Sequence, residues 1–302
     1  TMTSTDFASF LPPLAEKLTE ETSKNLVQQI KQTPLDVPFS ATAIKTTYVQ
    51  QGEGELPLVL LHGFDSSLME FRRLFPKVSP VTETWAVDFF GFGLTDRPRD
   101  IPVTPDVIKA HLYAFWQQLI QRPMVLLGAS MGGAVAIDFA YTYPETVQNL
   151  VLLDSAGLVK GHGMGKFMIP PLDRLATAFL SNSTVRQKIS ENAYYDRSLA
   201  SEDALTCSRL HLAHPNWSRA LISFTKSGGY SFLEDNRINE ITQPTLIIWG
   251  ERDQILGTKD AKQFEAMIPD SKLVWIPEAG HVPHLEKPDL TAQAIADFLR
   301  KI

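Results

Sequence analysis

The clearest chemical signal in the chain is a serine enclosed by glycines, in the stretch Gly128 to Gly133, which reads Gly-Ala-Ser-Met-Gly-Gly. The apolar run Met124 to Leu127 precedes it directly, and the helix-forming run Ala134 to Ile137 follows it. A G-x-S-x-G motif between a strand and a helix places its serine on a sharp, strained turn that exposes the hydroxyl. The glycines let the strand and the helix pass closely without a Cβ clash. The motif therefore predicts Ser130 as a nucleophile.

A serine nucleophile needs a general base, and two histidines near the end of the chain compete for that role. His281 follows Gly280, and His284 lies three residues later. Both belong to a segment expected to form a loop after the last strand, as an imidazole that must reach over Ser130 requires. We predict His281 as the base. His284 is expected to pair with Glu286 or to cap the final helix.

Two aspartates compete to orient the imidazole. Asp253 lies in the loop after the apolar run Thr245 to Gly250, and Asp154 ends the preceding predicted strand. Both positions fall at the carboxyl ends of parallel strands, where open α/β sheets bind their ligands. The chain order serine, acid, histidine matches one of the known orders for such a triad. We predict Asp253 as the acid and keep Asp154 as the alternative.

A nucleophile of this kind also needs donors for the negative oxygen that forms during attack. The tripeptide His62-Gly63-Phe64 ends the first strong apolar run and supplies a loop beside the predicted nucleophile. We assign the donor role to the backbone N–H groups of Phe64 and Met131, because the latter begins a helix, where N–H groups lack partners. His62 itself is expected to be a structural residue that forms hydrogen bonds.

The segments that must position these residues are short apolar runs without polar alternation, separated by helix-like segments. Such runs predict parallel strands buried on both faces, and their alternation with helices predicts a doubly wound, mostly parallel α/β sheet. An earlier run, Ala43 to Gln50, is expected to be an edge strand. The main runs are Pro57 to His62, Thr84 to Asp88, Met124 to Gly128, Leu150 to Asp154, Thr245 to Gly250 and Leu273 to Pro277.

Helix signals fall between these strands. Thr104 followed by Pro105 and Asp106 is a typical helix start, with a capping residue, a proline in the first position and an acid in the first turn. From about 156 to 240, however, the chain contains no strand-like run. Helices are expected there at Leu172 to Leu180, Ser183 to Asn192, Ser201 to Leu212 and Trp217 to Lys226.

The predicted organisation has four parts. Residues 1–42 form an N-terminal helical segment, 43–155 the first part of the α/β core, 156–240 an inserted helical cap, and 241–302 the second part of the core. Because the insertion lies between two core strands, it is expected to cover the sheet edge that carries the site.

Composition narrows the class of protein. The chain has 302 residues, of which 44% are hydrophobic, and a formal net charge of −6, which disfavours nucleic acid or an anionic membrane as the main partner. The single cysteine, Cys207, allows no intrachain disulfide and no cysteine-based metal cluster. Neither a secretory leader in Thr1 to Pro13 nor a membrane-spanning run is expected. We predict a cytoplasmic protein that acts on a small molecule without a cofactor; the oligomeric state stays open.

From about Thr46 to Ile302 the chain resembles the cap-bearing α/β-hydrolases. The resemblance implies a Ser130–Asp253–His281 triad, an inserted cap and no cofactor. Serine at position 130 separates the chain from the similar haloalkane dehalogenases and epoxide hydrolases, which use an aspartate. The matching pieces are His62-Gly63-Phe64, Asp88-Phe89-Phe90-Gly91-Phe92-Gly93, Gly128-Ala129-Ser130-Met131-Gly132-Gly133, Trp249-Gly250-Glu251-Arg252-Asp253 and Gly280-His281-Val282-Pro283-His284.

Three functions are compatible with this resemblance. The first is hydrolysis of a carboxylic ester. The second is carbon–carbon bond hydrolysis of meta-cleavage products, which would need Arg174, Arg186 or Arg209 to hold a substrate carboxylate; those enzymes, however, usually have a more glycine-rich loop than Phe64-Asp65-Ser66-Ser67. The third is a small-molecule receptor with a retained triad. Aromatic residues of the predicted cap suit an apolar substrate or simply pack the cap: Phe167, Phe179, Tyr194, Tyr195, Trp217, Phe224 and Tyr230.

Overall fold

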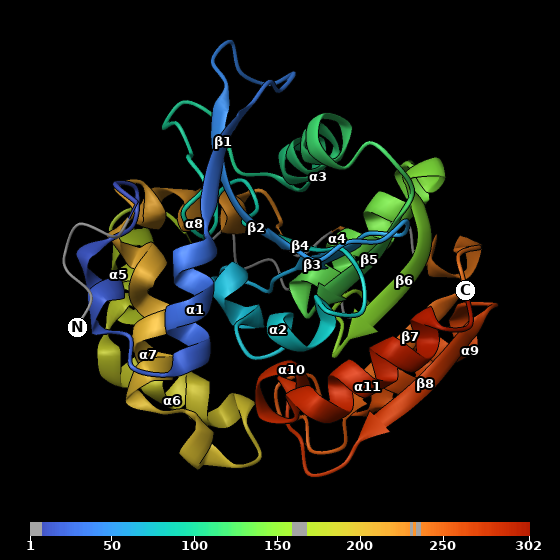
Figure 1. Ribbon diagram of the computed structural model, residues 1–302. Coiled ribbons are helices and arrows are strands. Elements are labelled where there is room, and N and C mark those ends of the chain that lie inside the picture. The colour runs from blue at the N-terminus through green and yellow to red at the C-terminus, as the bar shows by residue number, and fades with distance from the viewer. Residues whose placement is uncertain (1–7, 159–167, 230–231, 234–236) are drawn as a thin grey trace.

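The computed structural model describes residues 8–158, 168–229, 232–233 and 237–302, and in this part of the chain eight strands form one sheet (Figure 1). Their order is β1-β2-β4-β3-β5-β6-β7-β8, with antiparallel pairing at β1–β2 and β2–β4 and parallel pairing elsewhere. The predicted doubly wound, mostly parallel sheet is confirmed. The strands are β1 (Lys31–Leu35), β2 (Ile44–Gln51), β3 (Leu58–Leu61), β4 (Thr84–Val87), β5 (Met124–Ala129), β6 (Val147–Leu153), β7 (Thr245–Gly250) and β8 (Ser271–Ile276).

The prediction of an edge strand at Ala43 to Gln50 is wrong in one respect. The corresponding strand β2 lies between β1 and β4, and β1 forms the edge. The sequence of β1, Lys-Gln-Thr-Pro-Leu, has no apolar run that would reveal it. Pro34 lacks an N–H group and is tolerated because the strand has a neighbour on one side only. The N-terminal segment predicted as helical therefore also supplies a strand.

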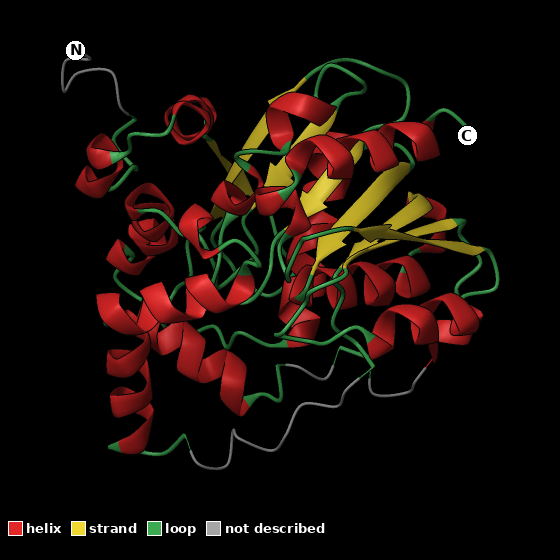
Figure 2. Cartoon of the chain, turned by 90° about the horizontal axis from the view of Figure 1, so that it is seen from below, coloured by secondary structure: helices red, strands yellow, loops and turns green. Residues whose placement is uncertain are grey.

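Helices cover both faces of the sheet (Figure 2). Residues of α3, α4 and α9 share one core with Val59 and Leu61 of β3, whereas residues of α1, α2 and α11 share a second core with Leu58 and Leu60. This alternation follows from the period of two along a strand. These helices are α1 (Glu21–Gln29), α2 (Phe75–Val78), α3 (Pro105–Phe115), α4 (Met131–Thr142), α9 (Lys259–Met267) and α11 (Pro288–Leu299).

Shorter helical turns connect the larger elements. Thr104 begins α3 as predicted, because its side chain accepts a hydrogen bond from the N–H group of Val107 at 3.1 Å. A π-helical turn, η3 (Trp116–Ile120), continues that helix. Among the described residues, no helix combines the length and the apolar character needed to cross a bilayer. The remaining short elements of the body are η1 (Pro13–Lys17), η2 (Leu68–Phe71), η4 (Pro144–Thr146) and α10 (Pro283–Glu286).

The chain between β6 and β7 is helical in its described part, close to the predicted positions. We call α5 to α8 the cap helices; in Figure 1 they lie together, away from β7 and β8. Residues 159–167, 230–231 and 234–236 of this interval lie outside the described residues. The elements are α5 (Leu172–Ser181), α6 (Ser183–Ala193), η6 (Arg197–Leu199), α7 (Glu202–Arg209), η7 (Leu210–Ala213), α8 (Trp217–Lys226) and η8 (Arg237–Glu240).

The N-terminal segment joins the body to the cap helices. In α7, Asp203 accepts hydrogen bonds from the N–H groups of Thr19 and Glu20, at 2.6 and 3.0 Å, and from the hydroxyl of Ser23 at 2.6 Å. On its other side, α1 contacts β2 and η2. A single buried carboxylate therefore fixes the start of α1 against α7.

The approach of α4 to the sheet depends on two glycines. A Cβ atom on Gly128 would overlap the carbonyl group of Gly132, and one on Gly132 would overlap the carbonyl oxygens of Leu61 and His62. These obstacles are backbone atoms, which cannot rotate away as a side chain can. Glycine at both positions therefore lets α4 start directly beside β3 and β5.

We predict that Gly132→Ala lowers the free energy of unfolding by roughly 2 to 4 kcal/mol, because α4 must shift to make room for a methyl group. The control is Gly257→Ala, where a Cβ would meet nothing within 4 Å but φ is +73°. Its cost should be about 1 to 2 kcal/mol, from the left-handed backbone alone. Urea unfolding measures both. Equal costs would mean that close approach does not require glycine at position 132.

Candidate active site

Ser130 occupies the turn between β5 and α4 in a strained conformation. Its φ is 53° and its ψ is −118°, a region that residues with a side chain rarely adopt. Two contacts fix the turn: the N–H group of Ser130 donates to the carbonyl of Leu153 at 3.0 Å, and its own carbonyl accepts from Ala156 at 3.0 Å. The result is a serine hydroxyl held at the carboxyl edge of the sheet by backbone geometry.

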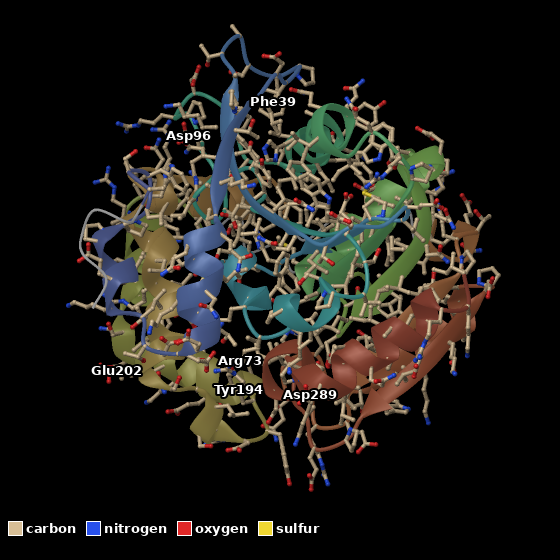
Figure 3. The ribbon with its side chains drawn as sticks, viewed as in Figure 1. Phe39, Arg73, Asp96, Tyr194, Glu202 and Asp289 are labelled. Atoms are coloured by element: carbon tan, nitrogen blue, oxygen red, sulfur yellow. The ribbon has the colours of Figure 1, made fainter. Side chains whose placement is uncertain are left out.

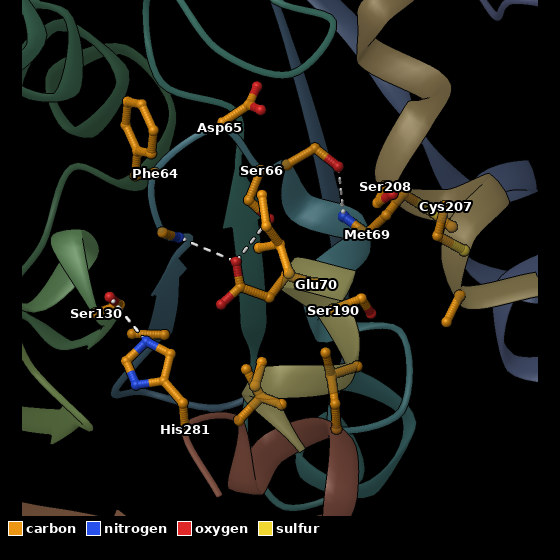
Figure 4. Close-up of a pocket in the computed structure, with 18 of the residues that line it drawn as sticks. Phe64, Asp65, Ser66, Met69, Glu70, Ser130, Ser190, Cys207, Ser208 and His281 are labelled. Carbon is orange, nitrogen blue, oxygen red and sulfur yellow. Dashed lines mark hydrogen bonds between the residues drawn. The ribbon is translucent and has the colours of Figure 1, made fainter. Parts of the chain in front are cut away.

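The structure brings Ser130, His281 and Asp253 into one hydrogen-bonded chain (Figure 4 shows the first link). Nε2 of His281 lies 3.1 Å from Oγ of Ser130, and Nδ1 lies 2.8 Å from Oδ2 of Asp253. The three residues come from the β5–α4 turn and from the loops after β7 and β8. They were the predicted nucleophile, base and acid.

Electrostatics define the direction of these bonds. Burial would raise the pKa of Asp253, but the hydrogen bond with His281 and the charge interaction between the two lower it. Oδ1 of Asp253 also accepts from the N–H groups of Ile255 and Leu256, at 2.8 and 2.9 Å. An ionised carboxylate only accepts, so Nδ1 of His281 must donate. Nε2 is then left to accept the hydroxyl proton of Ser130.

Asp154, the alternative acid, contacts Asp253 and not His281 through its hydrogen bonds. Its carboxyl accepts from the N–H group of Gly250 at 3.1 Å, and it shares a hydrogen bond with Asp253. Burial, this hydrogen bond and the repulsion from Asp253 raise the pKa of Asp154 well above its ordinary range. A protonated Asp154 can donate to Asp253, so the two aspartates hold different positions in the network.

Asp154, Asp253 and His281 form the one group in the described part of the chain whose donor atoms lie close enough to hold a cation, within 4.8 Å of one another. Two of these atoms, Nδ1 of His281 and Oδ2 of Asp253, are already hydrogen-bonded at 2.8 Å. Asp154 in its protonated form offers a poor ligand, because a metal prefers the carboxylate. The cluster fits a hydrogen-bond relay better than a metal site.

The loop that carries His281 is fixed to the cap helices. The N–H group of His281 donates to the carbonyl of Ala193, the last residue of α6, at 2.8 Å. Glu286 accepts from the N–H groups of Gly280 and Tyr195, at 2.8 and 2.9 Å. These bonds tie the loop after β8 to the end of α6. Glu286 is therefore occupied by backbone groups.

The predicted roles of His284 are wrong. It neither pairs with Glu286 nor caps the final helix; Nε2 lies 2.9 Å from Oε1 of Glu70, from η2. Glu70 also accepts from the N–H group of Gly63 at 3.0 Å and from the hydroxyl of Ser66 at 2.7 Å. No sequence motif revealed Glu70, because its partners lie far along the chain or in an irregular loop.

Glu70 is a largely buried carboxylate, with its side chain 10% exposed, that lines the same cavity as Ser130 (Figure 4). Burial would raise its pKa, but the hydrogen bond and charge interaction with His284, and the donors Gly63 and Ser66, lower it to about 2. It therefore remains ionised at neutral pH. Its function in the folded chain is to hold the loop of Gly63 and Ser66 against η2.

This loop passes directly beside the nucleophile. A Cβ atom placed on Gly63 would lie 3.5 Å from Cβ of Ser130. Phe64 follows in the chain, and Met131 is the first residue of α4. His62 is fully buried, with Nδ1 2.8 Å from the carbonyl oxygen of Gly63 and Nε2 accepting from the N–H group of Phe89 at 3.2 Å. Those contacts match the structural role expected for His62.

Asp65, the next residue of the loop, is held by three side chains of the cap region. Oδ2 accepts from Nη1 of Arg186 at 2.7 Å, and Oδ1 accepts from Nε2 of His211 and Nε1 of Trp217, each at 2.9 Å. Burial would raise its pKa, but His211 and Arg186 lower it to about 2. Sequence reasoning did not find this residue, because no local pattern predicts a partner more than a hundred positions away.

Ser130 and His281 line a cavity of about 350 Å³ between the sheet edge and the cap helices (Figure 4). Hydrophobic side chains supply much of its wall, and Asp65 and Glu70 also line it. The hydrophobic lining residues include Phe64, Met69, Leu180, Ile189, Tyr194, Ile255, Val282 and Leu285.

The arginines considered for a substrate carboxylate differ in position. Arg186 lines the cavity, but it is engaged by Asp65 and by the carbonyls of Leu180 and Ser208. Arg174 lines a different hollow, and Arg209 is not among the described lining residues of the cavity.

The cap aromatics have several roles. Tyr194 lines the cavity, and Trp217 binds Asp65. Phe224 is buried against Phe64, with ring centroids 5.8 Å apart. The others are exposed (Phe179 and Tyr195) or lie outside the described residues (Phe167 and Tyr230).

The fold and the serine turn define a hydrolase of the α/β class. A family model described as "alpha/beta hydrolase fold" matches residues 57–288, and the chain belongs to this family. The resemblance suggested by the sequence is thereby confirmed.

Relatives within the family differ in the reactions that their names give. The chain is 31% identical to the alpha/beta hydrolase domain-containing protein VTE7 of Arabidopsis thaliana, over 97% of this chain and 90% of that protein. It is 27% identical to the 2-hydroxy-6-oxo-6-(2'-aminophenyl)hexa-2,4-dienoic acid hydrolase of Metapseudomonas resinovorans, over 95% and 96%. A solved structure, a thermophilic esterase of Thermogutta terrifontis, superimposes with a TM-score of 0.76 at 22% identity, covering 90% and 98%. This last likeness shows the fold alone.

We predict that Asp154→Asn stabilises the protein increasingly as the pH rises. The raised pKa of Asp154 means that the folded state keeps a proton that the unfolded state releases above its ordinary pKa, so the parent loses stability as the pH rises. Each pH unit between the two pKa values is worth about 1.4 kcal/mol. Asparagine cannot ionise and can still accept from Gly250 and donate to Asp253.

Chemical denaturation of both proteins from pH 4 to pH 8 measures this difference. Effects of the other carboxylates cancel, because both proteins contain them. A difference in unfolding free energy that stays constant across this range would show that Asp154 is ionised in the folded protein.

Proposed function

We propose that the protein hydrolyses a carboxylic ester, or a related acyl bond, of a small and largely apolar substrate through Ser130, His281 and Asp253. One observation carries the proposal: the continuous hydrogen-bonded chain from Asp253 to Ser130 at the wall of a cavity with a largely hydrophobic lining. A hydroxyl bonded to an oriented imidazole is the arrangement that activates serine for attack on a carbonyl.

In the first half of the reaction, Nε2 of His281 removes the proton of Ser130 as Oγ attacks the carbonyl carbon. Asp253 keeps Nδ1 protonated and stabilises the imidazolium that forms. The tetrahedral intermediate then collapses, and its C–O bond to the alcohol breaks. The alcohol takes its proton from Nε2, which leaves an acyl-enzyme on Ser130 and a neutral imidazole.

We assign the stabilisation of the oxyanion to the backbone N–H groups of Phe64 and Met131. Support comes from the position of Met131 at the first turn of α4, where the helix dipole favours negative charge. Phe64 follows Gly63, which the carboxylate of Glu70 holds close to Ser130. Rigid placement matters because donors that need no reorganisation stabilise a transition state most effectively.

In the second half, water attacks the acyl group while Nε2 of His281 accepts one of its protons. Collapse of this second intermediate breaks the bond to Oγ, returns the proton to Ser130 and releases the acid. No step needs a group beyond those in the chain and water. We further propose that residues 156–240 act as a cap that shapes the substrate cavity, since α6, α7 and η7 supply much of its wall.

A second candidate is hydrolysis of a carbon–carbon bond, supported by the 27% identity to the dienoic acid hydrolase of Metapseudomonas resinovorans. It would use the same triad. Of the three arginines considered for a substrate carboxylate, only Arg186 lines the described cavity. Arg186 is already bound by Asp65, which argues against this reaction. The loop Phe64-Asp65-Ser66-Ser67 also differs from the more glycine-rich loop usual in those enzymes, and we place the ester reaction first.

We predict that the protein releases nitrophenolate from p-nitrophenyl esters between acetate and octanoate, with a preferred chain length set by the cavity. Ser130→Ala should lower the rate by roughly a thousandfold or more, because the nucleophile is lost. Absorbance under initial-rate conditions measures both. Turnover that the variant retains would place the reaction elsewhere in the protein, and no turnover in either would favour the carbon–carbon or receptor hypotheses.

A matched pair of variants distinguishes the two acids. We predict that Asp253→Asn lowers kcat by about a hundredfold to ten-thousandfold, because the asparagine no longer enforces the tautomer with a proton on Nδ1. Asp154→Asn should stay within about threefold of the parent, since a protonated aspartate and an asparagine donate alike. The same ester assay serves for both. A larger loss at position 154 would make Asp154 the acid.

A further inference from the structure

Arg72 is a buried cation in the wall of the cavity. It directly follows η2, the short helix that also carries Glu70, and its side chain is 4% exposed. It lines the cavity together with Met69, Tyr194 and Cys207. No sequence motif pointed to it, and the proposed ester reaction assigns it no role.

The guanidinium of Arg72 has few partners. It carries five N–H donors. In the described part of the chain it forms one hydrogen bond, from Nη1 to the carbonyl of Met69 at 3.2 Å. Nε is buried without a hydrogen-bond partner in the described part of the chain. Oε2 of Glu20 is 3.9 Å from it, beyond hydrogen-bond distance. A buried guanidinium with unused donors is costly and needs an explanation.

The neighbouring arginine shows how this region satisfies such a group. All three nitrogens of Arg73 form hydrogen bonds: Nε and Nη2 donate to Glu20, and Nη1 donates to the carbonyl of Leu285 and the hydroxyl of Tyr194 (Figure 3). Arg73 is not among the described lining residues of the cavity. Of these two arginines, the one with few hydrogen bonds, Arg72, lines the cavity, whereas the fully hydrogen-bonded Arg73 does not.

The carboxylates near Arg72 accept their hydrogen bonds from other groups, although Glu20 also forms an ion pair with Nε of Arg72 at 3.9 Å. Glu20 is bound by Arg73 at 3.0 Å, and Asp203 is bound by the N–H groups and hydroxyl of the N-terminal segment. Neither carboxylate uses the donors of Arg72. Glu70, the other acid nearby in η2, is occupied by His284, Gly63 and Ser66. These carboxylates therefore accept no hydrogen bond from Arg72, which lines the cavity.

We propose that Arg72 forms a polar subsite that binds an acceptor oxygen of the substrate, a ketone or a carboxylate, remote from the bond that is cleaved. A cavity with hydrophobic walls and one placed cation is the usual way in which a pocket fixes the orientation of a mostly apolar ligand. The inference rests on the proposed function for the identity of the cleaved bond. The subsite itself does not depend on catalysis.

The test is a binding experiment that needs no reaction. The ligands are linear 2-ketones and linear carboxylates of about five to seven carbons, each compared with the 1-chloroalkane of the same chain length, which carries no oxygen acceptor. Dissociation constants come from ligand-observed NMR titrations of the full chain. We expect the ketone, the carboxylate or both to bind roughly 10- to 100-fold more tightly than the chloroalkane, as hydrogen bonds to a charged group contribute.

Arg72→Met keeps an unbranched apolar stem and removes the donors, so this preference should fall to within about threefold. Arg209→Met is the matched control: its Nε is also buried without a partner among the described residues, but the residue does not line the cavity. The control should keep the preference. Thermal unfolding by circular dichroism checks that each variant is folded; if Arg72→Met is not, Arg72→Lys should show a weakened preference.

The outcomes are distinct. A preference for the ketone, the carboxylate or both over the chloroalkane that depends on Arg72 supports the subsite and identifies the chemistry of its oxygen. A preference that persists in Arg72→Met, or no preference in the parent protein, overturns it. Because binding does not require Ser130 to react, failure of ester turnover would contradict the proposed function and leave this result intact.

Discussion

The rest of the site depends on the backbone at Ser130. A residue with a side chain at positive φ costs about 1 to 3 kcal/mol, so the fold must hold it there by other contacts. The N–H and C=O groups of Ser130 form hydrogen bonds with the end of β6 and the chain that follows it, and the glycines at 128 and 132 bring α4 against β3 and β5. Ser130 is thereby positioned by backbone atoms, which vary far less than side-chain rotamers. His281 and Asp253 are placed relative to the Ser130 hydroxyl by the hydrogen bonds that join the three residues.

A second principle of the site is that two adjacent aspartates behave differently because their surroundings differ. Asp253 receives two backbone N–H groups and the imidazole of His281, which favour its charged form. Asp154 is more deeply buried, receives one N–H group and lies next to the charge of Asp253, which favours its neutral form. Environments that push two pKa values apart assign different roles to chemically identical groups. The same carboxylates in the opposite environments would exchange these roles.

The sequence predicted the parts of this molecule that local chemistry determines. The buried strands, the start of α3 and the cap helices follow from apolar runs and capping residues. The chain order of Ser130, Asp253 and His281, together with the resemblance to α/β-hydrolases, was enough to choose residues that the fold brings into contact. Strand β1 was not predicted, because most of its residues are polar and it pairs at the edge of the sheet. The sequence did not reveal Asp65, Glu70 and Arg72, because their distinguishing feature is burial next to residues far along the chain. The wrong prediction for the partner of His284 has the same cause. No spacing along the chain encodes which residues of the loops after β3 and β8 face each other.

The hydrogen bond from His281 to the carbonyl of Ala193 joins the base to the end of α6, and Asp65 joins the loop beside Ser130 to Arg186 of the same helix. The position of α6 and the order of both loops are therefore thermodynamically linked. A ligand that touches only α6, and binds better when that helix is in place, must favour the ordered loops by the same free energy with which the loops favour the ligand. Under the proposed function, a substrate that contacts α6 would help to hold His281 and the loop of Asp65 in place, even through atoms far from its scissile bond.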